Sequence, residues 1–324
     1  MNTAGELRSL SLGQALVRAK EILQTSPALV DQGRVETEAE LLACYALQTS
    51  TDKPVTRLDF YSKINNTFPD PALSCLLKWS ELRAQGHLLQ HLTGFQTFLD
   101  HEYEVGPQVL IPRTETELLF SKALEVFKAG NLIPQLGFEI GLGSGILSIE
   151  LLSHFQSLKM MASEISEEAR IIALKNASRI LDQSQARLTV LRAQDSSEVW
   201  QPFDRVLQQS PDRVRADFLI TNPPYLSCDD PIDQDVLDHE PRLALFPFGD
   251  SKSDSLFFYR AIAEQAHEYL TEQGVIFAEI PHQRSMELKN EFESSGFWSV
   301  EIFQDLNKRD RVLVATRKGS HPKV

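Results

Sequence analysis

The chain has 324 residues, 42% of them hydrophobic and 24% charged, and a formal net charge of -13. This composition fits a globular protein with one large domain or two unequal ones, and no apolar run in the sequence is long enough to span a bilayer. The acidic balance argues against wide non-specific contact with a phosphate backbone, so nucleic acid is an unlikely direct substrate.

The cysteines and the first residues bear on where the protein works. Cys44, Cys75 and Cys228 lie far apart, without metal-ligand spacing or the even count of a disulfide framework, so we expect reduced cysteines and no metal. The start of the chain lacks a basic segment followed by an apolar core, unlike a secretory signal. We therefore expect a cytoplasmic protein, and we expect it to be monomeric.

Residues 1–90 are predicted to be helical. Apolar residues recur at three- and four-residue spacing over 12–24 and 35–48, and 71–86 begin with proline and end with glycine, which suits a helix. Residues 91–113 alternate aromatic and polar side chains and predict a β-hairpin linker with its turn at Asp100 and His101.

A third region, 114–324, starts with a helix and continues as an α/β domain. Thr114 with Glu117 predicts a capping box at the helix start. From about Gly137, short apolar strands alternate with helices, which indicates a doubly wound parallel sheet, here closed by an antiparallel pair over 298–318. Residues 202–218 are predicted to form a polar surface loop before the next strand.

A glycine-rich turn follows the first strand of this domain. Gly141, Gly143 and Gly145 stand between a strand and a helix, where glycine permits a tight turn and a close ligand, and the helix offers free N–H groups. The G-x-G-x-G spacing differs from the dinucleotide G-x-G-x-x-G, and a purely structural turn remains an alternative.

Three carboxylates follow or interrupt the neighbouring strands. Glu164, about twenty residues beyond the glycine turn, stands where nucleotide-binding folds hold ribose hydroxyls, with an exposed helix cap as the alternative. Asp195 follows the third strand and is predicted to reach an adenine amino group. Glu139 lies inside an apolar strand. It is predicted to bond the glycine loop or approach a charged part of the ligand, or alternatively to lie at an exposed strand end.

The fourth strand ends abruptly at the sequence DFLITNPPYL, residues 217–226. Pro223 and Pro224 cannot donate to a sheet, so the backbone carbonyls there stay free as acceptors at the carboxyl edge where ligands bind. The Asn222 side-chain oxygen and the Pro223 carbonyl suit the two hydrogens of a planar NH2 group, and Tyr225 suits its flat face. The pattern predicts a substrate that is an amide or an aromatic amine.

These motifs, with the upstream sequence VLIPRTETELL, resemble the HemK/PrmC family of S-adenosylmethionine-dependent methyltransferases, which methylate a glutamine amide in peptide chain release factors. The resemblance covers nearly the whole chain and implies a Rossmann-like class I methyltransferase domain with a seven-stranded mixed sheet, and a helical module that recognises the substrate protein. Asn222, Pro223 and Tyr225 would be catalytic, and Pro224 and Arg113 would also bind substrate. The implied S-adenosylmethionine site, which releases S-adenosylhomocysteine, comprises Glu139, Gly141, Leu142, Gly143, Ser144, Gly145, Glu164, Asp195, Ser196 and Asn222.

Some positions depart from the family pattern. Leu142 replaces a common threonine, Thr114 a usual proline, and Ser196 an aromatic residue that could cover the adenine. Arg113 is predicted to contact substrate or the NPPY segment, or else to belong to a charged helix start. Glu240 is predicted to order either Arg113 or the active-site loop. Besides release factors, a ribosomal-protein glutamine, a nucleic-acid amine and a non-catalytic cofactor-binding role remain alternatives.

Overall fold

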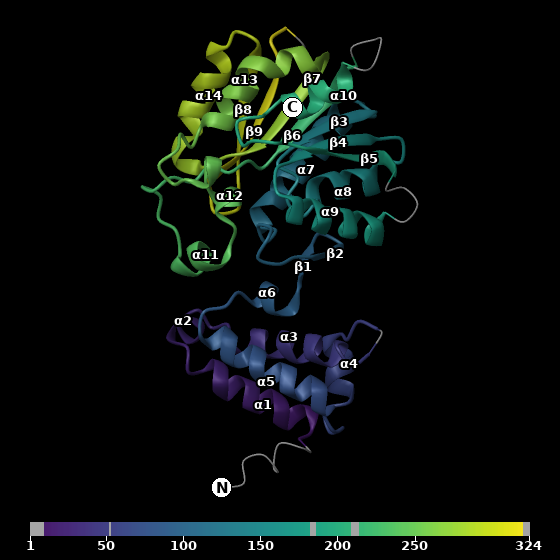
Figure 1. The fold of residues 1–324 in the computed structure, drawn as a ribbon, viewed down its shortest axis with the longest axis vertical. Coiled ribbons are helices and arrows are strands. Elements are labelled where there is room, and N and C mark those ends of the chain that lie inside the picture. The colour runs from purple at the N-terminus through teal and green to yellow at the C-terminus, as the bar shows by residue number, and fades with distance from the viewer. Residues whose placement is uncertain (1–9, 52, 182–185, 209–213, 320–324) are drawn as a thin grey trace. The chain divides into compact units, whose positions relative to one another are not determined.

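The computed structural model describes residues 10–51, 53–181, 186–208 and 214–319 (Figure 1). Contacts between Cα atoms divide the chain into two compact units, Met1–Phe95 and Gln96–Val324. The first contains the helices α1 (Leu12–Leu23), α2 (Pro27–Asp31), α3 (Val35–Gln48), α4 (Arg57–Ser62), α5 (Asp70–Ala84) and α6 (Leu89–Thr93).

The helices of the first unit are held by an apolar core and a buried ion pair. Leu16, Leu42 and Leu76 of α1, α3 and α5 are almost fully buried against one another. Within the same unit, Arg83 Nε donates to Glu38 Oε2 at 2.6 Å, and both side chains are buried. A buried charge is tolerated when its partner is close, so this pair fixes how α3 packs on α5.

The predicted hairpin and the helix after it are present, although the hairpin turn lies at Leu99 and Asp100 rather than at Asp100 and His101, and the predicted helix cap is wrong. β1 (Phe95–Phe98) and β2 (His101–Glu104) form a two-stranded sheet, and α7 (Thr114–Ala129) follows. Thr114 is the first helical residue instead of the cap. Arg113 occupies the cap position without a side-chain hydrogen bond to the first turn of the helix, and the Thr114 hydroxyl instead donates to Glu115 at 3.2 Å.

The second unit is an α/β domain built on a seven-stranded mixed sheet, as predicted. Its strands are β3 (Leu136–Ile140), β4 (Lys159–Glu164), β5 (Leu188–Arg192), β6 (Ala216–Thr221), β7 (Leu270–Glu279), β8 (Trp298–Gln304) and β9 (Asp310–Arg317). They lie in the order β5-β4-β3-β6-β7-β9-β8, with parallel pairing from β5 to β7 and β9 antiparallel to both neighbours.

Helices cover both faces of this sheet, which explains its apolar strands (Figure 1). Phe218 and Ile220 pack towards α7, α8 (Ile146–His154) and α9 (Glu167–Ile180). Leu219, between them, packs towards α10 (Gln201–Leu207), α13 (Phe257–Tyr269) and α14 (Ser285–Ser294). Because consecutive side chains point to opposite faces, a strand buried on both sides must be apolar throughout.

Part of the predicted polar loop is a helix. Residues 202–207 lie in α10, where Phe203 and Leu207 are buried against the sheet and the polar residues face outwards. Residues 209–213 lie outside the described part of the chain. The short helices α11 (Gln234–His239) and α12 (Arg242–Leu245) with the 3-10 turn η3 (Pro247–Gly249) follow β6, and η4 (His282–Arg284) follows β7.

Candidate functional site

The site lies where the strand order reverses. β3 has β4 on one side and β6 on the other, so the loops after β3 and β6 leave the sheet next to each other. A Cβ atom built on Gly141, directly after β3, would lie 4.0 Å from the Asn222 backbone oxygen, directly after β6. In open α/β sheets such a switch point is the usual ligand crevice.

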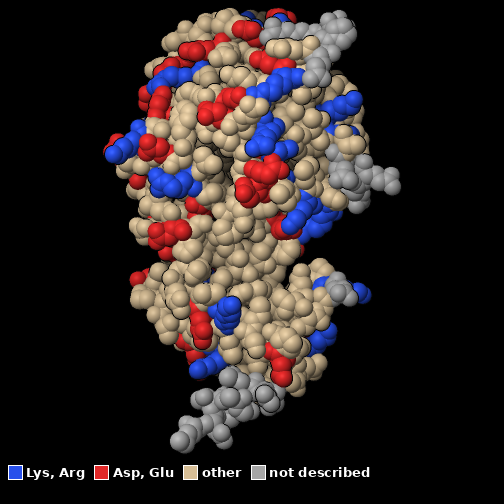
Figure 2. Space-filling view, viewed as in Figure 1, with Lys and Arg blue, Asp and Glu red and all other residues tan. Residues whose placement is uncertain are grey.

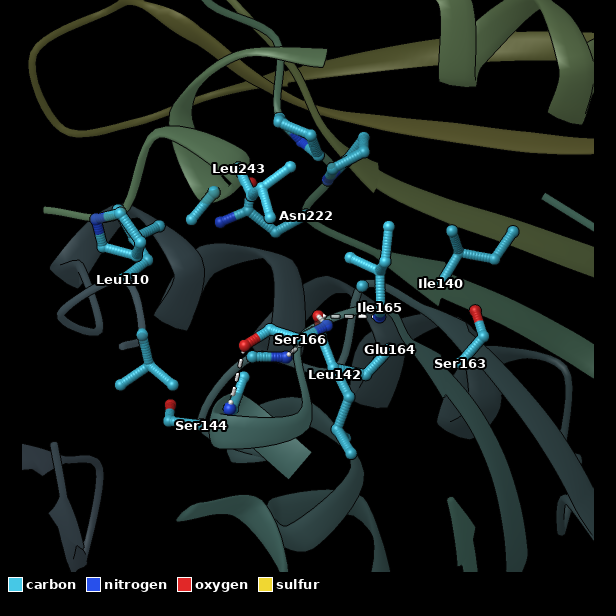
Figure 3. Close-up of a pocket in the computed structure, with 18 of the residues that line it drawn as sticks. Leu110, Ile140, Leu142, Ser144, Ser163, Glu164, Ile165, Ser166, Asn222 and Leu243 are labelled. Atoms are coloured by element: carbon cyan, nitrogen blue, oxygen red, sulfur yellow. Dashed lines mark hydrogen bonds between the residues drawn. The ribbon is translucent and has the colours of Figure 1, made fainter. Parts of the chain in front are cut away.

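The glycine turn is held open by main-chain conformation and by Glu164. Gly141, Gly143 and Gly145 all have positive φ values, of 78°, 56° and 89°. The Glu164 carboxylate accepts the N–H of Gly143 at 2.9 Å and, through its other oxygen, those of Ile165 and Ser166, also at 2.9 Å (Figure 3). Burial raises the pKa of Glu164, and these three donors oppose the shift.

Glu164 is therefore not an exposed helix cap, which was the alternative. Ser166 caps α9 by accepting from the Ala169 N–H at 3.1 Å, while Glu164 faces the glycine turn. A carboxylate offers about four lone-pair directions, and three are used here. The remaining capacity faces the cavity that Glu164 helps to line.

Glu139 is buried rather than exposed, with 1% of its surface accessible. Its Oε2 accepts the Ser148 N–H at 3.1 Å and also the Ser148 hydroxyl, in the first turn of α8. Burial raises the pKa of Glu139 to about 8, against the opposing effect of the Ser148 hydrogen bonds. A cavity-lining carboxyl group with this pKa responds strongly to a nearby positive charge.

The other strand ends complete a cavity of about 170 Å³. Asp195 is exposed and accepts from the Ser197 N–H at 2.8 Å and hydroxyl at 2.6 Å through one oxygen, which lowers its pKa. The lining includes Glu139, Gly141, Leu142, Gly143, Ser144, Glu164, Asp195, Ser196, Asn222, Pro223, Pro224 and Arg113. Gly145 does not line the cavity. An added Cβ there would lie 2.9 Å from the side chain of Ile149, so this glycine allows α8 to pack.

A second cavity of about 110 Å³ also adjoins the NPPY segment. Asn222 and Pro223 line both cavities, whereas Tyr225 lines only the second. The backbone turns away from the sheet after Thr221, because neither proline can donate to β7. The NPPY segment therefore borders both a larger cavity, lined in part by Glu139, Glu164 and Asp195, and a smaller one, lined in part by Tyr225, Leu226 and Glu279.

Arg113 and Glu240 hold the wall shared by the two cavities. Glu240 is buried and pairs with the Arg113 guanidinium, as predicted, and it also accepts the Ile111 N–H at 2.8 Å. Burial raises the pKa of Glu240, opposed by the charge of Arg113. Arg113 lines both cavities. Its guanidinium is held by the Glu240 carboxylate, which is 127 residues away in sequence.

Several contributors were missed at the sequence level. Apolar residues after β6 line the larger cavity, among them Phe248, Phe258 and Leu243. Figure 3 shows Leu243 near Asn222. Thr116 and Glu279 lie beneath Asn222 in a buried polar network. The sequence signal for them was that Glu279 ends an apolar strand, since a buried carboxylate implies a specific partner.

The described residues hold no cluster of three or more His, Cys, Asp or Glu side chains arranged to bind a metal ion. Within the same residues, no helix combines the length and apolar character needed to cross a membrane. On the face shown in Figure 2, acidic and basic side chains of the Gln96–Val324 unit are interspersed rather than gathered by sign.

Comparison with known proteins decides the family. The chain is 30% identical to the release factor glutamine methyltransferase of Geobacter sulfurreducens over 286 residues, which cover 88% of this chain and 89% of that protein. The chain belongs to the HemK/PrmC family. It is also 29% identical to the release factor glutamine methyltransferase of Lactococcus lactis over 263 residues, covering 80% and 88% of the two chains.

Among solved structures, the chain is similar to the release factor-specific protein-(glutamine-N5) methyltransferase of Alicyclobacillus acidocaldarius, with 19% identity, a TM-score of 0.40 and coverage of 66% of this chain and 99% of that one. No protein-family model matches the chain. Membership of the HemK/PrmC family rests on the full-length sequence relatives.

Proposed function

We propose that this protein transfers a methyl group from S-adenosylmethionine to the side-chain amide nitrogen of a glutamine in peptide chain release factors. The observation that carries the proposal is that Asn222 and Pro223 line both cavities at the switch point of the sheet. A methyl donor in the larger cavity and an amide in the smaller one would meet at these two residues. The family relatives, named for this activity, support the choice of glutamine.

The residues of the larger cavity fit the proposed donor. No protein atom lies within 4 Å of a Cβ built on Gly143, so a ligand can approach the backbone there closely. Glu164 and Asp195 have acceptor capacity for hydroxyl and amino groups, and Glu139 offers a carboxylate to a positive charge. When bound, S-adenosylmethionine supplies an electrophilic methyl group on a positively charged sulfur. No metal is proposed to take part.

The NPPY segment would position the nucleophile. The Asn222 side-chain oxygen and the Pro223 carbonyl would each accept one N–H of the planar glutamine amide, which draws electron density onto its nitrogen and fixes that nitrogen for in-line attack. Tyr225 would pack against the flat face of the amide. The nitrogen becomes acidic as it gains the methyl group, so its proton can leave to water and no strong base is needed.

We further propose that the helical region, residues 1–90, and the hairpin, residues 91–113, present the substrate protein. The family resemblance supports this assignment, and the first unit has its own apolar core and its own buried ion pair. A unit with an independent core can supply a recognition surface without altering the methyl-transfer site.

The test is to incubate the purified protein and S-adenosylmethionine separately with release factors, a ribosomal fraction and DNA, and to map methylated sites by peptide mass spectrometry. The proposal predicts one added CH2 group on a release-factor glutamine. Methylation confined to a ribosomal protein or to DNA would refute the proposed substrate. Binding of S-adenosylmethionine without transfer to any of the three would indicate a non-catalytic role.

A further inference from the structure

A buried network beneath the NPPY segment connects three elements of the second unit. Asn222 Nδ2 donates to the Thr116 hydroxyl oxygen at 3.4 Å, and the Thr116 hydroxyl donates to Glu279 Oε2 at 2.7 Å. The Tyr225 hydroxyl donates to the other carboxylate oxygen, Glu279 Oε1, at 3.2 Å. Thr116 and Glu279 are 1% and 2% exposed, so water does not compete for these groups.

The direction of these hydrogen bonds follows from how many protons each group has. Burial raises the pKa of Glu279, while the hydrogen bonds from Thr116 and Tyr225 and the charge of Arg311 favour its ionised form. The ionised carboxylate only accepts, so the single Thr116 proton is committed to Glu279. The Thr116 oxygen is then an acceptor towards Asn222, and an acceptor can pair only with the amide NH2 and not with the amide oxygen. Helix α13 adds a further restraint, since the Tyr259 hydroxyl donates to the Glu279 backbone oxygen at 2.6 Å.

This direction fixes which end of the Asn222 amide is available to a ligand. With its NH2 group held by Thr116, the Asn222 side-chain oxygen has no hydrogen-bond partner within the described residues. That oxygen is the acceptor that the proposed function requires for the N–H of a substrate amide. A side-chain amide turned by 180° would instead present a donor to a donor, which opposes binding in the productive orientation.

We infer that Thr116 and Glu279 are positioning residues that orient the Asn222 amide for methyl transfer, through a hydrogen-bond relay from Glu279 to Thr116 to Asn222. The inference rests on the proposed function and deepens it. Neither residue needs to touch the substrate amide for the relay to act. The 3.4 Å contact is long for a hydrogen bond, and such contacts commonly shorten when substrate completes the site.

Thr116→Val tests the relay because valine has nearly the shape of threonine but no acceptor. We expect kcat for release-factor methylation to fall by about 10- to 100-fold, the loss typical when an outer partner that orients a functional group is removed, while the Kd for S-adenosylmethionine from calorimetry changes far less than kcat. Thr116→Ser keeps the hydroxyl and should restore kcat to within about threefold. Unchanged kcat in Thr116→Val, or no rescue by serine, would overturn the relay.

Thr221→Val is the matched control. Thr221 is also buried, and its hydroxyl donates to the Ile140 carbonyl at 2.7 Å outside the relay. Both valine variants lose one buried hydroxyl beside the same segment, and thermal unfolding should report comparable destabilisation. We expect the loss of kcat only in Thr116→Val. An equal loss in Thr221→Val would mean that general loosening, not orientation, lowers the rate, and would overturn the relay.

A readout without substrate separates the relay from the proposed function. In protein labelled with ¹⁵N-asparagine, the Asn222 side-chain NH2 resonances, assigned by their absence in Asn222→Ala, should shift in Thr116→Val and stay near their original positions in Thr116→Ser. Unchanged chemical shifts of the Asn222 NH2 group in Thr116→Val, relative to wild type, would overturn the relay even if release factors are methylated. Shifted resonances with no release-factor methylation by wild type would refute only the proposed substrate.

Discussion

Glu139 gives a strong prediction for pH dependence. Its carboxyl group is buried, lines the larger cavity and has a pKa of about 8 because of burial. If a positively charged donor binds beside it, the bound state requires the carboxylate, so binding in acidic solution must first remove a proton. The free protein is then about 1% ionised at this group at pH 6 and about half ionised at pH 8.

The affinity change follows directly from these fractions. The apparent Kd for S-adenosylmethionine should become about 50-fold tighter from pH 6 to pH 8, and binding at pH 7 should release about 0.9 proton from Glu139. Calorimetry in two buffers of different ionisation enthalpy measures that release. Glu139→Gln, which cannot ionise, controls for titration of the ligand itself. Equal pH dependence and equal proton release in wild type and Glu139→Gln would refute the reasoning.

The same group affects the stability of the ligand-free protein with a defined sign. Glu139 has a folded-state pKa above its usual value of 4.5, so the folded state holds the proton more tightly than the unfolded state. Its stabilising contribution is therefore complete below pH 4.5 and is lost as the pH rises to about 8, by up to about 1.4 kcal/mol per pH unit within that window. Denaturant unfolding of wild type and Glu139→Gln at pH 5 and pH 8 isolates this contribution.

Three further predictions concern other parts of the chain. Glu38→Ala leaves Arg83 buried without its carboxylate and should lower the free energy of unfolding by about 3–5 kcal/mol in urea denaturation. Gly143→Ala forces alanine to a φ of 56°, which costs about 1–2 kcal/mol, and should weaken S-adenosylmethionine binding about tenfold by calorimetry. Glu240→Gln removes the charge that holds Arg113 and should lower kcat/KM for release factor about tenfold.

Each of these has a contradicting result. Glu21→Ala breaks an exposed pair with Arg18 and serves as the control for Glu38→Ala, with an expected change of about 0.5 kcal/mol or less. Equal effects of the two would contradict the importance of burial. If Gly143→Ala binds S-adenosylmethionine with wild-type affinity, the methyl donor does not lie against the backbone at Gly143. If Glu240→Gln keeps the wild-type kcat/KM, the charge of Glu240 is not needed to hold Arg113 in its active position.

The fold and the position of the site were predictable because they depend on local patterns. Strand β6 ends at Thr221, as the two prolines after it require, and the glycine turn follows β3. The alternating strands and helices predicted the sheet with its antiparallel strands. These features depend on proline, glycine and apolar periodicity, whose effects extend over a few residues.

Other parts depend on tertiary packing. Thr116 and Glu279 are 163 residues apart, so no local pattern joins them. Whether Glu139 is exposed or buried depends on how α8 packs over β3, and its Ser148 partner appears only in the folded chain. The capping box predicted at Thr114 failed because the helix starts one residue earlier than that motif requires, with Arg113 at the cap position.

The central claim is tested most directly by single-turnover methylation of a purified release factor, comparing wild type with Asn222→Ala at saturating S-adenosylmethionine. We predict that wild type adds one CH2 group to a glutamine side chain, and that Asn222→Ala loses at least about 100-fold in rate while its Kd for S-adenosylmethionine stays within about threefold. Transfer to that glutamine at the wild-type rate by Asn222→Ala would contradict the account.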